Sequence, residues 1–130
     1  MPIKIAVVLL CVLINPYAAN LRFEILNEDG QSLPCRIHLF DQNKKLQRVE
    51  GLPYWHDHFV CPGSALLELA TGRYIYEIER GPEYERFKGG ILISDESPEI
   101  VKHQLQRISN LRSEGWYSGD LHIHRPLSQI

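Results

Sequence analysis

The chain has 130 residues, of which 44% are hydrophobic and 23% charged, and its formal net charge at neutral pH is −2. This length suits one modest domain, and the composition excludes wholesale disorder. Like charges are not gathered in blocks, so nothing in the sequence favours a nucleic acid as partner.

The first nineteen residues are predicted to be a signal peptide. Lys4 precedes an apolar run from Ile5 to Ile14, Asn15-Pro16 ends this run, and Ala18-Ala19 supplies small residues for cleavage. Such a run is too short to span a bilayer as a helix but suits a signal peptide. The alternative is a buried N-terminal strand or helix of a cytosolic protein. We therefore expect a secreted or periplasmic protein without membrane contact after cleavage.

Two cysteines follow the predicted cleavage site, and both fall in segments that are predicted to be strands. They are Cys35 and Cys61. Export leads to an oxidising compartment in which disulfides persist. The sequence is compatible with a bridge between them and equally with two buried thiols, because a bridge requires a particular Cα separation.

From Leu21 onward, short segments of alternating apolar and polar residues are separated by turn residues. This pattern predicts an all-β fold, an antiparallel sandwich of the immunoglobulin-like or transthyretin-like kind. Segments 65–69 and 73–80 are expected to form a hairpin around Ala70-Thr71-Gly72, and 101–108 would also tolerate a helix. The predicted strands are 21–25, 35–39, 58–61, 65–69, 73–80, 87–93 and 100–108.

Several turns in this region carry a resemblance to a known module. Glu28-Asp29-Gly30, the turn at Gly63 and the stretch Leu69–Tyr74 resemble the carboxypeptidase-regulatory-like β-sandwich, which commonly has a small-Gly-x-Tyr hairpin near its centre. Gly72 can take the positive φ of a tight turn, and Tyr74 begins the next buried face. The resemblance implies an accessory sandwich over residues 20–108, followed by a polar linker from residue 109.

The segment after the linker contains a His-x-His pair within Trp116-Tyr117-Ser118-Gly119-Asp120-Leu121-His122-Ile123-His124. Alternate side chains of a strand point the same way, about 7 Å apart, so Asp120, His122 and His124 would share one face. Imidazoles and a nearby carboxylate suit zinc, manganese or iron. The alternative is an exposed strand end with two incidental histidines.

This segment follows a β-sandwich and resembles the start of the catalytic domain of the polymerase and histidinol phosphatase (PHP) superfamily, nearest to its carbaryl-hydrolase-like metallohydrolases. The resemblance implies that residues 109–130 contain the linker and the first strand of a distorted β/α barrel. It also implies that His122 and His124 bind metal, with Asp120 as a further candidate ligand. No other catalytic or cofactor-binding residue is assigned.

The resemblance has two departures. Many relatives have Thr or Ser after the second histidine, whereas Arg125 and Pro126 follow it here. The family's further ligands lie on later barrel strands, beyond Ile130. We therefore expect these 130 residues to be inactive alone, to bind no metal tightly, and to depend on a C-terminal catalytic domain as partner.

A second histidine pair lies in Trp55-His56-Asp57-His58-Phe59. The favoured interpretation is a solvated loop that enters a strand with Phe59 packed inward. A surface metal site, or a sugar platform beside Tyr54 and Trp55, is the alternative. The stretch Glu79–Glu85 resembles one found in sandwich domains that precede such hydrolases, and is otherwise expected to be a solvated loop braced by Pro82 and Tyr84.

Two functions from different classes follow. The leading hypothesis is the N-terminal part of a secreted metal-dependent hydrolase, in which metal-activated water attacks a phosphoester, ester or amide. The alternative is a self-sufficient exported binding module for a carbohydrate or protein ligand, without catalysis.

Overall fold

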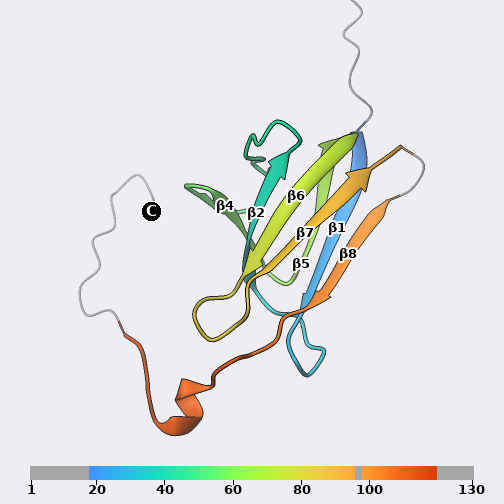
Figure 1. Ribbon diagram of the computed structural model, residues 1–130. Helices are drawn as coiled ribbons and strands as arrows, with labels where there is room; N and C mark the ends of the chain where they lie inside the picture. Colours follow the sequence, from blue (N-terminus) through green and yellow to red (C-terminus); the bar gives the residue numbers. More distant parts are fainter. Residues whose placement is uncertain (1–17, 96–97, 120–130) are drawn as a thin grey trace, which may run out of the picture.

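Two β-sheets face each other in the computed structural model, which describes residues 18–95 and 98–119 (Figure 1). One sheet has the strand order β3-β4-β2-β6-β7 and the other β5-β1-β8. A short 3-10 helix, η1, spans Leu111–Glu114. The predicted all-β sandwich is confirmed. The strands are β1 (Ala18–Leu26), β2 (Cys35–Asp41), β3 (Tyr54–Trp55), β4 (His58–Cys61), β5 (Ser64–Ala70), β6 (Gly72–Glu79), β7 (Phe87–Ile93) and β8 (Glu99–Gln104).

Alternation along the strands builds the core between the two sheets. Every second residue points inward, because successive side chains of a strand lie on opposite faces. Phe23 of β1 is fully buried, and its ring packs edge-on against Phe59 and Tyr76 of the other sheet. Phe59 is fully buried as well, and so are the aliphatic side chains of Leu21, Ile25, Ile37, Leu39, Leu67, Ile78, Ile93 and Leu105.

The predicted hairpin between segments 65–69 and 73–80 is wrong. Both strands form, but β5 pairs with β1, whereas β6 pairs with β2 and β7. Each strand has one apolar face, so the connection at Ala70-Thr71-Gly72 crosses the sandwich and places the two apolar faces toward each other. Gly72 has a φ of 150° and Tyr74 is buried, as the sequence predicted.

The edges of the sheets hold two further differences from the prediction. β8 pairs with β1 in parallel, because β7 belongs to the other sheet and the chain crosses over before β8 begins. The two-residue strand β3 was not predicted, since Pro53 and Gly51 in front of it are turn residues. The segment from residue 101, which would have tolerated a helix, is a strand.

The first strand of the sandwich begins inside the segment predicted as a signal peptide, residues 1–19. β1 begins at Ala18, and Ala19 is buried opposite Leu69. Cleavage after Ala19 would leave β1 to begin at Asn20. Residues 1–17 lie outside the described residues. Over the described ranges, no helix has the length and apolar character needed to cross a bilayer.

Cys35 and Cys61 are direct partners on β2 and β4. Both are buried free thiols on the inner face of the sheet. A hydrogen bond to Cys61, together with burial, raises the pKa of Cys35 above its ordinary value. Of the two arrangements compatible with the sequence, the structure has the unbridged one.

The turn between β4 and β5 depends on a glycine. Gly63 has a φ of 110°, and its carbonyl accepts a 2.7 Å hydrogen bond from the amide of Ile25. A Cβ at Gly63 would collide with the Ser32 hydroxyl and lie 2.9 Å from the backbone nitrogen of Leu33. Gly30 also has a positive φ, 76°, but a Cβ there would meet no atom within 4 Å.

We predict that Gly63→Ala lowers the free energy of unfolding by about 2–4 kcal/mol, because it adds a backbone collision to the cost of a positive φ. The matched control Gly30→Ala carries only the conformational cost, about 1 kcal/mol. Urea denaturation of the two variants measures the difference. Equal losses would contradict the close approach of the Gly63 turn to residues 32–33.

Candidate functional site

The predicted metal ligands Asp120, His122 and His124 lie outside the described residues, as does the predicted first barrel strand. The described chain ends at Gly119, directly before them. Two features of the described part bear on function. One is the attachment of the segment that leads to these residues, and the other is the surroundings of the second histidine pair.

The chain after β8 is fastened to the end of the sandwich by its backbone. The amide of Leu105 donates to the carbonyl of Leu26, and the amide of Ile108 donates to the carbonyl of Glu83, both at 2.9 Å. The amide of Glu85 donates to the carbonyl of Gln106 at 3.0 Å. The linker therefore begins as an added strand-like segment along the β6–β7 loop, at the end of the sandwich opposite the start of β1 (Figure 1).

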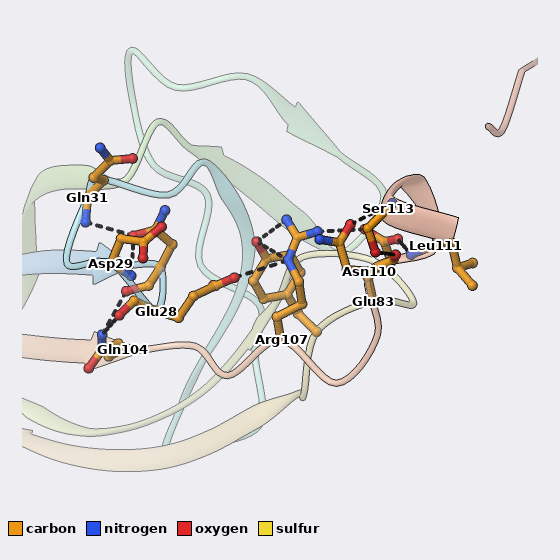
Figure 2. Close-up of polar contacts among 11 residues, drawn as sticks. Glu28, Asp29, Gln31, Glu83, Gln104, Arg107, Asn110, Leu111 and Ser113 are labelled. Atoms are coloured by element: carbon orange, nitrogen blue, oxygen red, sulfur yellow. Dashed lines mark hydrogen bonds and ion pairs between the residues drawn. The ribbon is translucent and has the colours of Figure 1, made fainter. Parts of the chain in front are cut away.

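Arg107 is the centre of the polar contacts at this junction (Figure 2). Its guanidinium donates to the Tyr84 hydroxyl at 2.7 Å, and it lies 3.3 Å from a Glu83 carboxylate oxygen and 3.2 Å from one of Glu28. The other Glu83 oxygen accepts a 2.9 Å hydrogen bond from the amide of Leu111. A single arginine thus joins the segment after β8 to the β1–β2 turn and the β6–β7 loop, and Glu83 extends this connection to η1.

The helix η1 gives the linker a fixed shape. Asn110 caps its start, and Gly115 ends it with a φ of 85°. The amide of Trp116 then donates to the carbonyl of Leu111 at 3.0 Å. Trp116 and Tyr117 are 69% and 77% exposed. They border a groove of about 790 Å³ between the linker and the β6–β7 loop.

The two histidines of the second pair, His56 and His58, contact different aromatic rings. β3 and β4 are joined by the two-residue turn His56-Asp57, and His56 has an unfavourable φ of 51°. The His56 ring lies edge-on to Trp55 at 4.5 Å, whereas the His58 ring lies 5.3 Å from that of His38 on β2. Asp57, the other residue of the turn, faces His58 and His38.

The prediction that this stretch enters a strand with Phe59 packed inward is confirmed, because Phe59 is fully buried at the second position of β4. The expectation of a solvated loop is wrong for His58, whose side chain is only 13% exposed. The aromatic platform is not formed. Tyr54 and Trp55 are adjacent in β3, so their side chains lie on opposite faces. Tyr54 packs against the core, and Trp55 is half exposed.

Asp57 lies between two imidazoles. One of its carboxylate oxygens is 3.0 Å from His58 Nδ1 and the other is 3.4 Å from His38 Nδ1. The hydrogen bond with His58 lowers the pKa of Asp57, and the two imidazoles lower it further when they carry charge. Asp57 is therefore a carboxylate at neutral pH. One donor atom from each of the three residues lies within 4.8 Å of the others.

Glu79 lies next to His38, near the ring nitrogen that does not face Asp57. Its carboxylate lies 3.7 Å from His38 Nε2, 3.0 Å from an Arg36 nitrogen and 3.2 Å from an Arg86 nitrogen. Burial raises its pKa, but the Arg36 hydrogen bond and the charges of Arg86, His38 and Arg36 outweigh burial and leave it lowered. Glu79 is therefore ionised and held in place by two arginines.

The sequence offered a surface metal site of His56, Asp57 and His58 only as the alternative to a solvated loop. The structure replaces His56 in that group with His38, which the sequence did not single out. The stretch Glu79–Glu85 was expected to be a solvated loop braced by Pro82 and Tyr84, and Tyr84 is indeed buried beneath Arg107. Glu79 differs from this expectation, because it belongs to β6 and is buried. The surroundings of His38 and Glu79 had no local signal in the sequence, because they depend on the pairing of β2 with β4 and β6. The alternation around His38 placed its side chain on the outer face of β2. It did not indicate which strands lie on either side of β2, and so did not indicate that His58 and Asp57 are its neighbours.

No protein-family model matches the chain, and no curated protein matches it. Among solved structures, it is similar to GBS52, the minor pilin of the gram-positive pathogen Streptococcus agalactiae, with 16% identity and a TM-score of 0.58. The match covers 72% of this chain and 46% of that protein. The Bacillus anthracis TIE protein is similar at 18% identity and a TM-score of 0.53, over 70% of this chain and 17% of that one.

These similarities show an immunoglobulin-like β-sandwich, consistent with the predicted fold class. The chain covers less than half the length of either neighbour.

We predict that Arg107→Ala releases the linker from the sandwich while the sheets stay folded. Amide hydrogen exchange at residues 108–115 should become at least about tenfold faster, since the variant removes the contacts that join three segments. The control Arg112→Ala removes the same type of side chain from η1, where it makes no ion pair among the described residues. Unchanged exchange in Arg107→Ala would show that the backbone hydrogen bonds alone hold the linker.

Proposed function

We propose that residues 20–108 are an accessory β-sandwich of a secreted or periplasmic metal-dependent hydrolase. The segment after the linker would carry the first metal-binding strand of the catalytic domain. His122 and His124, with Asp120 as a further candidate, would bind divalent zinc, manganese or iron. The metal would activate water against a phosphoester, ester or amide.

The observation that carries this proposal is the fixed exit of the chain from the sandwich. An independent module needs no ordered tail, whereas an accessory domain that positions a catalytic domain needs a defined connection to it. Here Arg107 and Glu83 attach the chain up to Leu111. η1 continues the ordered path to Trp116, a few residues before Asp120.

Trp116 and Tyr117 support the same proposal. Two large, exposed aromatic side chains at the end of an ordered linker form an apolar surface that the following catalytic domain would cover. They also border the groove beside the β6–β7 loop. The domain interface would therefore include this groove.

Export is supported by the N-terminal sequence pattern and by the fold. The apolar run from Ile5 to Ile14 suits a signal peptide. The sandwich also resembles domains of a minor pilin of a gram-positive pathogen.

The experiment begins with the nucleotide sequence past the codon for Ile130. We expect an open frame that encodes further histidines and acidic residues. The protein from that longer frame should hydrolyse a generic phosphoester or ester, lose activity in EDTA and regain it with added metal. His122→Ala and His124→Ala should each lower activity at least about a hundredfold. His56→Ala is the matched control and should leave the activity unchanged.

A stop codon directly after Ile130, together with a protease-resistant product, would contradict the proposal. It would favour the exported binding module, whose ligand would be a carbohydrate or a protein. EDTA-sensitive hydrolysis by the 130-residue chain alone would overturn the expectation that the first strand is inactive without the rest of the barrel.

A further inference from the structure

We propose that His38, Asp57 and His58 form a second metal site, independent of His122 and His124, that binds a divalent ion of the zinc class on the outer face of the β3-β4-β2-β6-β7 sheet. Two imidazole nitrogens and a carboxylate oxygen, mutually within 4.8 Å, make up the donor set. Imidazole and carboxylate ligands are typical of zinc sites.

Strand pairing sets the positions of the two histidines. β2 and β4 are antiparallel, and Ile37 lies opposite Phe59. The residue after Ile37 and the residue before Phe59, His38 and His58, therefore lie side by side, with their ring centroids 5.3 Å apart. Their side chains are only 15% and 13% exposed, which restricts the directions in which the rings can turn. The two nitrogens are therefore positioned before any ion arrives.

The third ligand, Asp57, already lies next to both imidazoles, with one carboxylate oxygen toward each ring. Donor atoms around a tetrahedral zinc ion lie roughly 3.3 Å apart, given Zn–N bonds of about 2.0–2.1 Å. The Asp57 oxygens already lie 3.0 and 3.4 Å from the two Nδ1 atoms. Asp57 lies in a two-residue turn and its side chain is 56% exposed, so the carboxylate can adjust without disturbing the sheet.

Glu79 lies at ion-pair distance from the other ring nitrogen of His38, 3.7 Å from Nε2. Metal-bound histidines commonly donate their other ring N–H to a carboxylate, which fixes the ring orientation. His38 directs Nδ1 to Asp57 and Nε2 to Glu79, at 3.4 and 3.7 Å. Arg36 and Arg86 hold the Glu79 carboxylate beside His38, so Glu79 would take the place of this orienting carboxylate after a small approach of the ring, rather than act as a ligand.

The surroundings leave room for a further ligand. The three residues border a surface depression of about 420 Å³, whose lining also includes Phe40 and Glu77. Three protein ligands leave one tetrahedral position for water or for an oxygen of a bound molecule. The buried thiols of Cys35 and Cys61 face the core on the opposite side of the sheet and contribute nothing to this site.

The test is zinc titration by calorimetry on the full chain carrying His122→Ala and His124→Ala, so that any contribution of the proposed hydrolase site is removed. We expect one zinc ion per chain. His38→Ala, His58→Ala and Asp57→Asn should each weaken binding by about 10–100-fold or more. His56→Ala, which removes the neighbouring histidine, should leave the affinity unchanged.

Circular dichroism identifies any of the three variants His38→Ala, His58→Ala and Asp57→Asn that fails to fold. The zinc affinities of the variants that do fold then decide the outcome. Absence of zinc binding in the His122→Ala and His124→Ala chain, or equal binding by the His38→Ala, His58→Ala and His56→Ala variants, would overturn the proposal and reduce the cluster to an ion pair. Neither result bears on the hydrolase, whose test uses His122 and His124.

Discussion

The contact of Phe23 with Phe59 and Tyr76 joins the two sheets, and the other features depend on it. Phe23 is fully buried, and its ring meets the other two edge-on at centroid distances of 6.4 and 5.4 Å. Edge-to-face aromatic pairs of this kind add to the free energy gained from burial. Because these three side chains point inward, the residues next to them in β1, β4 and β6 must point outward. The inner packing therefore determines which polar residues meet on the outside.

Two polar groups follow from this constraint. On the outer face, His58 and His38 become neighbours across β4 and β2, and Arg36 lies directly opposite Glu79 across β2 and β6. At the end of the sandwich, burial of Leu105 and Tyr84 brings the segment after β8 alongside the β6–β7 loop. There Arg107 reaches Glu83, and the linker takes its direction from that contact. A hydrophobic core thus positions both a candidate metal site and the connection to whatever follows residue 119.

Alternation within single segments was enough to predict most strands and the inward face of Tyr74, and the glycine at position 72 indicated a positive φ there. The pairing of those strands was harder to predict, since β5 and β6 look like a hairpin locally but lie in different sheets. The cluster of His38, Asp57 and His58 depends on the register between β2 and β4. The sequence therefore suggested His56 with Asp57 and His58, and gave no sign of His38. Arg107 and Glu83 are far apart in the chain, and their pairing likewise required the tertiary structure.

The connection between the sandwich and the segment that carries His122 and His124 is the central physical claim. Backbone ¹⁵N relaxation measures it most directly, because it reports the order of each amide in the linker. We predict order parameters of about 0.85 from Ile108 to Gly115, equal to those of β2 and β6. Values below about 0.6 over this stretch would contradict an anchored linker and would leave the sandwich as a module with a free C-terminal extension.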